Sequence, residues 1–240
     1  MWFERLMAGL FFVVGYFFGS FSTGYFFEKK HGHDIQSEGS GNIGTTNALR
    51  TMGKAAGAIT FLGDLAKAFI PTLVVRFVYC RIMGYGDDMT YIVTLVTGLG
   101  VFIGHIFPFY LRFRGGKGIA VAAAVIVATS CDGGIGLWMI FIGLAVFIIV
   151  VGVTRYVSLG SLIVLWYFPI YVSLKFWDSE YYWMALGLGL IFIALSYCKH
   201  AGNIRRLING TERKLFEKKS DEEDADNKEK KKDKKKNKKK

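Results

Sequence analysis

A short polar stretch, residues 38–47, is rich in glycine, asparagine and hydroxyl side chains and lies between two long apolar segments. Glycine adopts backbone angles that other residues avoid and lets the chain approach a ligand closely. Successive backbone N–H groups in such turns form a concavity that binds anions, and a helix starting after the turn adds its positive end. Arg50 follows and offers a planar fork of donors for a phosphate. The glycines alone would also suit a flexible connecting loop. The prediction of an anion site therefore rests on the whole stretch and not on its glycines.

Residues 39–44 also fit the pattern G-x-G-x-x-G, which marks dinucleotide-binding folds. That pattern is informative where it follows a strand inside a βαβ unit. Here it follows residues 31–36, which are polar and show no strand periodicity. We therefore expect no dinucleotide site at this position.

Three further polar segments, residues 114–118, 155–161 and 199–212, supply cations and backbone donors with few carboxylates. This composition suits a phosphate group better than a metal or a sugar. The first segment resembles half of a nucleotide-binding P-loop but lacks the Ser or Thr after the lysine, so it does not predict nucleotide binding. Lys117, flanked by glycines, is expected to contact a ligand, whereas Arg112 is expected to anchor the chain at the membrane.

Two histidines and one charged pair are further candidates. An imidazole can act as a general base near neutral pH or orient a hydroxyl, and His200 has Asn203 one helical turn away. His105 lies inside an apolar segment and is more simply a hydrogen-bonded structural residue. Asp64 and Lys67 stand three positions apart in another apolar segment. Ionisable groups at membrane depth mark a site or a mutual pair, and both interpretations stay open here.

Other chemistries are excluded because their patterns are missing. The sequence has no nucleophile elbow, no H-x4-D motif, and no acidic cluster for the metals that a phosphatidyl-transfer enzyme needs. Its three cysteines are scattered and show neither metal-binding nor disulfide spacing. We therefore expect no metal and no cofactor.

The chain has 240 residues, 52% of them apolar, and long apolar runs recur along it. A run of roughly 20 apolar residues is what an α-helix needs to cross a bilayer. The sequence therefore predicts an all-α integral membrane protein with seven transmembrane helices. The fourth, residues 119–130, is too short to span unless the bilayer is thin there or protein shields it. The others are expected at about residues 7–27, 56–81, 91–111, 135–153 and 181–197, with the sixth ending near residue 175.

Lysines and arginines gather in the connections after the first, third, fifth and seventh predicted helices, and acidic residues gather in the alternate connections. The positive-inside rule then places the N-terminus outside and the C-terminus in the cytoplasm. Every polar segment described above therefore faces the cytoplasm. Residues 1–214 form the predicted membrane domain. Residues 215–240, nearly all charged and rich in lysine, are expected to form a disordered cytoplasmic tail near anionic lipid headgroups.

Together, these segments resemble one known family, the bacterial acyl-phosphate:glycerol-3-phosphate acyltransferases (PlsY). The similarity extends in order from the first helix to Lys214. Ala68 departs from it, because the family often has glycine after the preceding lysine, and the charged tail is extra. The matching motifs are residues 39–47 with Arg50, residues 63–64 with Lys67, and residues 104–108, 115–118, 155–161, 200–204, 206–207 and 210–212.

The resemblance implies transfer of a fatty acyl group from acyl phosphate to the 1-hydroxyl of sn-glycerol 3-phosphate. The products are lysophosphatidic acid and phosphate, in the first step of phospholipid synthesis. It also implies an enzyme of the bacterial cytoplasmic (inner) membrane with its site on the cytoplasmic face, no cofactor and no nucleic-acid partner. The expected catalytic residues are Ser40, Lys117, His200 and Asn203. The expected substrate-binding residues are Gly41, Asn42, Thr46, Asn47, Arg50, Gly115, Gly116, Ser158, Arg205 and Arg206.

These residues suit that reaction because both substrates carry a phosphate that cations can hold. An acyl phosphate is an activated anhydride, so we expect direct attack by the glycerol hydroxyl, with the oxyanion held by loop N–H groups or side-chain donors. The proton acceptor is left open between His200 and the acyl phosphate itself. A transporter for a phosphorylated solute is the alternative, because it would also use cations and broken helices. It is disfavoured since the polar segments share one face and no inverted repeat is visible, and a structural scaffold would need none of these features.

Overall fold

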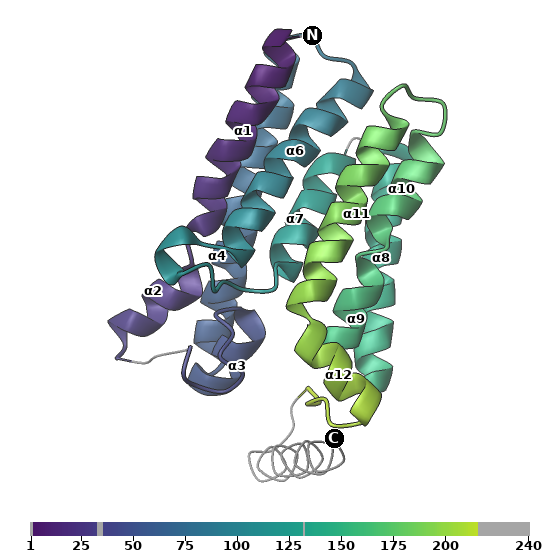
Figure 1. Ribbon diagram of the computed structural model, residues 1–240. Helices are drawn as coiled ribbons and strands as arrows, with labels where there is room; N and C mark the ends of the chain where they lie inside the picture. The colour runs from purple at the N-terminus through teal and green to yellow at the C-terminus, as the bar shows by residue number, and fades with distance from the viewer. Residues whose placement is uncertain (1, 33–35, 132, 216–240) are drawn as a thin grey trace, which may run out of the picture.

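The long apolar runs of the sequence form helices, as their composition predicts. The computed structural model describes residues 2–32, 36–131 and 133–215, and every regular element in these ranges is helical (Figure 1). The prediction of an all-α integral membrane protein is confirmed, whereas the predicted tail lies outside the described residues except for Leu215. Among the described residues, six helical segments are long and apolar enough to cross a membrane: Leu6–Lys30, Lys54–Ile82, Asp87–Leu111, Gly134–Thr154, Val157–Lys175 and Tyr182–Lys199.

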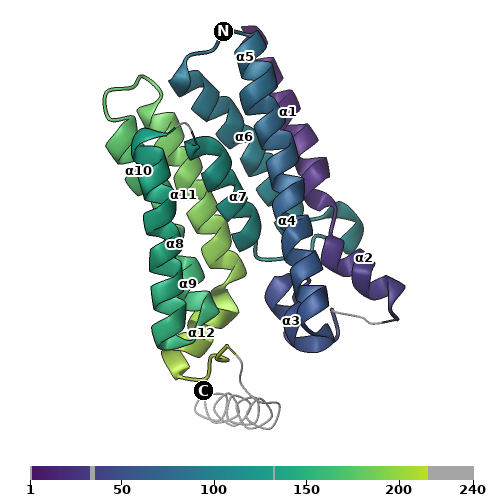
Figure 2. The same ribbon diagram turned by 180° about the vertical axis from the view of Figure 1, so that it is seen from behind.

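The helices form two groups that stand side by side (Figures 1 and 2). The first group contains α1 (Trp2–Ser20), α2 (Thr23–Lys30), α3 (Thr45–Met52), α4 (Lys54–Val74), the π-helical turn η1 (Val75–Tyr79), α5 (Cys80–Ile82) and α6 (Asp87–Ile106). The second contains α8 (Gly134–Thr154), α9 (Val157–Val164), α10 (Tyr167–Lys175), α11 (Tyr182–Lys199) and α12 (Ala201–Asn209). Between the groups lies α7 (Ile119–Ser130), which packs on α4, α6 and α8.

The helix α7 is the fourth predicted helix, and protein shields it. Val121, Ala124 and Val125 have no exposed surface. At its C-terminal end, where helix carbonyls lose their intrahelical partners, the buried Arg76 Nη1 donates to the carbonyl of Thr129 at 3.2 Å. A short helix is tolerated at membrane depth because neighbouring helices cover its sides and a side chain caps its end.

The chain runs back and forth between the two ends of the bundle (Figure 1). The N-terminus, α5 and the turn between α10 and α11 lie at one end. At the opposite end, which we call the polar end, lie α2, α3 and α12 (Figures 1 and 2). The glycine-rich stretch between α2 and α3 and the residues around α12 therefore meet at the same end of the molecule.

The first predicted helix is broken between α1 and α2. A break at membrane depth leaves backbone groups without helical partners. The Tyr110 hydroxyl accepts the N–H of Ser22 at 3.0 Å and donates to the carbonyl of Ser20 at 2.9 Å. The ammonium of Lys67 donates to the carbonyl of Phe21 at 2.9 Å. Side chains distant in the sequence thus satisfy the break, which is why the local pattern does not reveal it.

Three further boundaries differ from the sequence prediction. The sixth predicted helix is divided into α9 and α10 by a turn at residues 165–166. The helix α12 follows α11 after a bend at His200, where a basic connection was expected. The helix α3 begins at the end of the glycine-rich stretch and ends at Met52, with Gly53 separating it from α4. The second and third of these changes place additional helix ends at the polar end.

Glycines let α1 and α6 pack backbone against backbone. A Cβ at Gly19 of α1 would overlap the carbonyl of Val101, and a Cβ at Gly104 of α6 would overlap the carbonyl of Tyr16. Small residues spaced four apart allow this close approach between membrane helices. The contact fixes the end of α6, from which the chain continues to Lys117.

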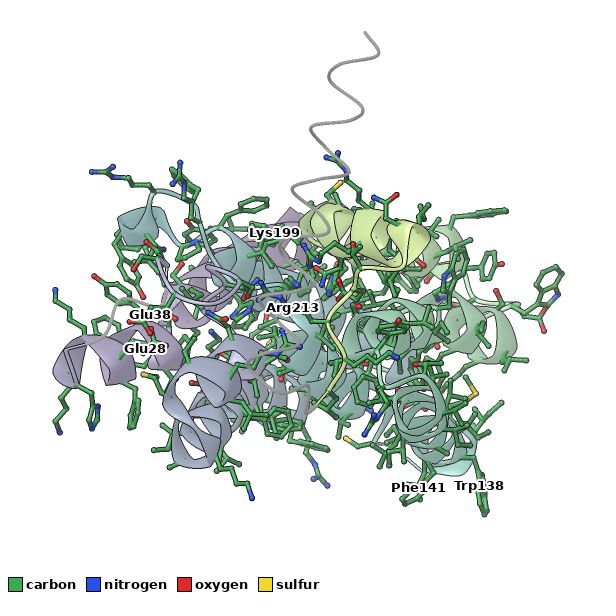
Figure 3. All side chains as sticks on the ribbon, turned by 90° about the horizontal axis from the view of Figure 1, so that it is seen from below. Glu28, Glu38, Trp138, Phe141, Lys199 and Arg213 are labelled. Atoms are coloured by element: carbon green, nitrogen blue, oxygen red, sulfur yellow. The ribbon has the colours of Figure 1, made fainter. Side chains whose placement is uncertain are left out.

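The outer surface of the bundle is apolar, which suits lipid rather than water. On α8, Trp138 is 70% exposed and Ile149 is 62% exposed. Figure 3, a view onto the polar end, shows Trp138 and Phe141 pointing away from the molecule at its periphery. Inside, Phe192 packs on both Phe102 and Phe168, with ring centroids 4.8 and 4.6 Å apart. These rings join α6, α10 and α11 into one core.

Candidate active site

A cavity of about 740 Å³ opens at the polar end between the two helix groups. Its walls come from the α2–α3 loop, α3, the connection between α6 and α7, α9 and the α11–α12 bend. In Figure 3, Lys199 and Arg213 point toward the middle of the molecule, between the two groups. The predicted site residues that line this cavity are Ser40, Gly41, Asn42, Thr46, Asn47, Arg50, Gly115, Lys117, Ser158, His200, Asn203 and Arg206.

Two predicted substrate-binding residues do not line this cavity. Arg205 lies beside Ile204 and Ile208 in a separate pocket of about 360 Å³ against α11, because neighbouring positions on a helix point in directions that differ by about 100°. Gly116 packs on the imidazole of His105, and a Cβ there would overlap Nε2. Glycine is needed at position 116 because a side chain there would overlap the imidazole of His105.

Asn47 holds the glycine-rich loop in place from within. Its Oδ1 accepts the N–H of Ser40 at 2.9 Å, and its Nδ2 donates to the carbonyl of Glu38 at 3.0 Å. Gly39 lies against the same side chain with φ of +60°, where a Cβ would overlap Oδ1. Although Asn47 reaches the cavity wall, its amide fixes the loop, so the geometry favours positioning over the substrate contact expected from the sequence.

The loop amides divide into two sets. The N–H groups of Ser40 and Gly41 donate inside the loop, to Asn47 and to Glu38, and the N–H of Gly44 donates to the Asn42 side chain at 2.9 Å. Thr45 and Thr46 begin α3, where amides have no partner inside the helix, and both residues line the cavity. The N-terminus of α3 therefore adds two backbone donors to the cavity wall, as a helix that starts after the glycine-rich stretch is expected to do.

Glu212 is the centre of a hydrogen-bond network that the predicted site list lacks. Its Oε1 accepts from Ser158 Oγ and from Asn203 Nδ2, each at 2.6 Å. Its Oε2 accepts from Arg206 Nε at 2.8 Å. The Oδ1 of Asn203 in turn accepts from Lys117 Nζ at 2.5 Å. Four predicted site residues are thus joined through one carboxylate that is 9% exposed.

The sequence contained a weak signal for this network. Glu212 is an acid within an otherwise basic segment, and it belongs to the last motif of the family resemblance. Its role could not be derived, because its partner Ser158 comes from α9 and Lys117, which is linked to it through Asn203, comes from the turn before α7. Asp64, His105 and Lys199 also line the cavity without having been in the predicted list.

His200 is buried at the bend between α11 and α12, with 2% of its surface exposed. Its Nδ1 lies 2.8 Å from the carbonyl oxygen of Ser196, so Nδ1–H donates there and Nε2 keeps a free lone pair. Burial, reinforced by the nearby Lys117 ammonium, lowers the pKa of His200 to about 4. The imidazole is therefore neutral near pH 7, a good hydrogen-bond acceptor and a weak base.

Lys117 is held by the turn that precedes it. The N–H of Gly115 donates to the carbonyl of Ile106, and the N–H of Gly116 to the carbonyl of His105, both at 3.1 Å. Burial lowers the pKa of Lys117 to about 8, although Glu212 favours the charged form. Lys117 is therefore still mainly a cation at neutral pH.

Asp64 and Lys67 pair with each other, which answers the question that their spacing left open. Lys67 Nζ lies 2.8 Å from Asp64 Oδ1 and 2.8 Å from Nδ1 of His105. Asp64 and His105 also line the cavity. Pairing and contact with the cavity thus occur together.

Within the described residues, no group of three His, Cys, Asp or Glu side chains comes together as metal ligands do.

Comparisons with known proteins give the same family over most of the chain. A family model described as "Glycerol-3-phosphate acyltransferase" matches residues 9–210. A protein named glycerol-3-phosphate acyltransferase from Clostridioides difficile is 40% identical over 212 residues, which cover 86% of this chain and 95% of that protein. A protein of the same name from Geobacter sulfurreducens is 38% identical over 203 residues, covering 85% of this chain and 95% of that protein.

Two crystal structures have a similar fold. One is described as the glycerol 3-phosphate form of PlsY, an integral membrane glycerol 3-phosphate acyltransferase. It has a TM-score of 0.72 and 30% identity, covering 87% of this chain and 95% of that one. The other is described as the lysophosphatidic acid form of the same enzyme, with a TM-score of 0.68 and 31% identity over the same shares.

Proposed function

The chain belongs to the glycerol-3-phosphate acyltransferase family, and we propose that the cavity at its polar end is where acyl transfer takes place. It is an acyltransferase of phospholipid synthesis that uses glycerol 3-phosphate as acceptor. We infer that the donor is a fatty acyl phosphate, that the acceptor atom is the 1-hydroxyl, and that the products are lysophosphatidic acid and inorganic phosphate. The enzyme needs no cofactor in this scheme, because the donor is already activated.

One observation carries this proposal: cations from both helix groups surround a single cavity. Arg50 comes from α3, Lys117 from the turn before α7, and Arg206 from α12. Thr45 and Thr46 add the positive end of α3. Two substrates that each carry a phosphate would repel one another in water, and such a set of donors can hold both at once.

The transfer proceeds by direct attack in this proposal. The glycerol hydroxyl oxygen bonds to the acyl carbonyl carbon, and the resulting oxyanion is held by Lys117 or by the α3 amides. The bond between that carbon and the bridging oxygen then breaks, and phosphate leaves. The proton of the hydroxyl goes to the phosphate of the donor, which is a stronger base than an imidazole whose pKa burial lowers to about 4.

His200 then has an orienting role. Its Nε2 lone pair accepts a hydrogen bond from the 2-hydroxyl of glycerol 3-phosphate, which keeps its proton, while Ser196 keeps the ring from rotating. Asn203, Ser158 and Glu212 hold Lys117 and Arg206 in place. Ser40, Asn42 and Thr46 line the same cavity and are proposed to contact the phosphates, whereas Gly41 and Gly115 let the backbone approach them.

The acyl chain lies against the apolar part of the cavity wall in this proposal. Phe61, Ile119, Phe147 and Val157 line the cavity together with the polar residues. Phe61 belongs to α4 and is 42% exposed. A chain entering between the helices would therefore stay in contact with apolar groups while its phosphate reaches the cations.

We propose seven membrane passes, with the N-terminus outside and the polar end in the cytoplasm of a bacterial inner membrane. The alternating direction of the chain, with α7 as the short shielded pass, supports this count. Residues 1–214 would form the enzyme domain, and the lysine-rich residues 215–240 a tail near anionic lipid headgroups. Glycerol 3-phosphate would then enter from the cytoplasm.

The proposal is tested by phosphate release from the purified protein in lipid nanodiscs, with palmitoyl phosphate as donor. We expect release that depends on glycerol 3-phosphate and yields lysophosphatidic acid. Lys117→Ala should lower the rate by about 100-fold or more, because it removes a donor to the developing charge. Lys54→Ala, which changes an exposed lysine at the start of α4, is the matched control.

The variant His200→Ala distinguishes between the two possible proton acceptors, His200 and the phosphate of the donor. Substantial remaining turnover is expected if the donor phosphate takes the proton, whereas complete loss would restore His200 as the base. If no phosphate is released from acyl phosphate and glycerol 3-phosphate is taken up into vesicles, the protein is a transporter and the proposed enzyme activity is wrong.

A further inference from the structure

Three buried side chains from two membrane-spanning helices meet beside the cavity. Asp64 and Lys67 belong to α4, His105 belongs to α6, and none is more than 6% exposed. Lys67 Nζ lies 2.8 Å from Asp64 Oδ1, 2.8 Å from His105 Nδ1 and 2.9 Å from the carbonyl oxygen of Phe21. An ammonium has three protons, and each has an acceptor here.

This arrangement fixes where the proton of His105 lies. Because Lys67 donates to Nδ1, that nitrogen is the acceptor and the neutral ring carries its proton on Nε2. The carboxylate of Asp64 does not compete for Nδ1, since its Oδ1 is 3.6 Å away, beyond hydrogen-bond distance. The tautomer is the opposite of that at His200, where Nδ1–H donates to a carbonyl.

The edge of the ring that carries Nε2 faces the turn before Lys117. A Cβ at Gly116 would overlap Nε2, so this ring and the backbone of Gly116 are in close contact. The backbone of His105 holds the same turn, since its carbonyl accepts the N–H of Gly116 at 3.1 Å. The position of Lys117 therefore depends on the orientation of one imidazole.

We propose that Asp64, Lys67 and His105 form a positioning unit for acyl transfer. Lys67, balanced by Asp64, holds the His105 imidazole in the tautomer protonated on Nε2, and this ring sets the turn that places Lys117 in the cavity. The inference rests on the proposed function for the role of Lys117 in binding glycerol 3-phosphate.

A positioning role explains why charges are kept at this depth. A buried ion pair is seldom more stabilising than apolar side chains of the same size. Here the ammonium joins three separate elements, since it contacts the break after α1, its own helix α4 and the end of α6. An apolar residue at Lys67 could fill the space but could not orient the ring.

The tautomer is measured by solid-state NMR of protein labelled with ¹⁵N-histidine in liposomes, with His105→Asn identifying the signal. We expect the signal of a neutral ring protonated on Nε2. The double variant Asp64→Asn/Lys67→Met removes both charges and leaves no unpaired ion, and it should give a mixture of tautomers. Lys54→Met, an exposed lysine on the same helix, should leave the signal unchanged.

Kinetics test the second half of the inference. In the double variant, the KM for glycerol 3-phosphate should rise about 10- to 100-fold, with a smaller change in the KM for acyl phosphate. Gly116→Ala, which displaces the turn without touching a charge, should raise the same KM and keep the wild-type tautomer. Thermal unfolding of each variant checks that the fold persists.

Two results would overturn the inference: a wild-type His105 protonated on Nδ1, or a folded double variant with an altered tautomer and the wild-type KM. The NMR signal is independent of the reaction, so it decides the tautomer even for a protein without acyl transfer. Absence of transfer in the wild type would contradict the proposed function instead.

Discussion

At the scale of single residues, burial changes the chemistry of the two groups nearest the proposed reaction. Lys117 and His200 both lie in the cavity wall, and burial lowers the pKa of each, to about 8 and about 4. A neutral imidazole and a cation can therefore coexist at neutral pH. That pairing suits a site that accepts a hydrogen bond from a hydroxyl on one side and holds a phosphate on the other.

We expect kcat/KM for glycerol 3-phosphate to fall as pH rises through about 8, where Lys117 loses its proton. The pKa of Lys117 is depressed, so its charge is present below about pH 8 and lost above it, earlier than for an exposed lysine. His200 stays neutral throughout this range and adds no further limb. Initial rates of phosphate release between about pH 5 and about pH 10 measure the profile.

Lys117→Arg is the matched variant for this profile, because a guanidinium keeps its charge across the whole range. It should remove the fall at about pH 8 even if the overall rate is lower. An alkaline limb that persists unchanged in Lys117→Arg would assign the titration to a different group.

At the scale of elements, the site depends on helices that approach very closely. The α1–α6 contact is made by glycines at Gly15, Gly19, Gly100 and Gly104, where any Cβ would overlap the partner backbone. Such packing is rigid, since neither backbone can yield as a side chain does. It sets the end of α6 and, through the turn at residues 115–116, the place of Lys117.

Gly19→Ala should therefore destabilise the protein by about 1–3 kcal/mol, the usual cost of inserting a methyl group into a close-packed contact. Gly9→Ala is the matched control on the same helix, because a Cβ there would meet nothing within 4 Å. Thermal unfolding of both variants in the same detergent gives the comparison. Equal midpoints for the two would show that α1 can move away from α6 without cost.

At the scale of the whole molecule, the arrangement separates two environments. Apolar side chains such as Trp138 and Ile149 cover the outside, and the cations converge at the polar end between the helix groups. A water-soluble substrate and a lipid-soluble one can thus reach one cavity from different directions. This requires the polar end to face the compartment that holds glycerol 3-phosphate.

Labelling in intact cells tests that orientation. Cysteines are introduced at Asp178, exposed in the α10–α11 turn, or at Lys54, exposed at the polar end, after Cys131 and Cys198 are changed to serine. A membrane-impermeant maleimide should label Asp178→Cys from outside and Lys54→Cys after lysis. The reverse pattern would invert the proposed topology, and labelling of both from outside would contradict the proposed seven passes.

The class of protein and the family follow from the amino-acid sequence alone, and so do the residue types of the candidate site. Apolar run length predicts membrane helices because a bilayer has a fixed thickness. The glycine-rich stretch and the segments with Lys117 and His200 identified the family because their order and spacing are specific. These features are local, so they can be recognised without knowing the fold. The individual roles given to the site residues stay predictions.

Which side chains contact each other depends on the tertiary structure. Ser158 donates to Glu212, and Lys67 Nζ contacts His105 Nδ1, through contacts between segments far apart in the chain. No local pattern encodes such pairs, because they depend on how α4, α6, α9 and α12 pack. The same holds for Arg205, since the direction of a side chain on a helix has meaning only when the neighbours of that helix are in place.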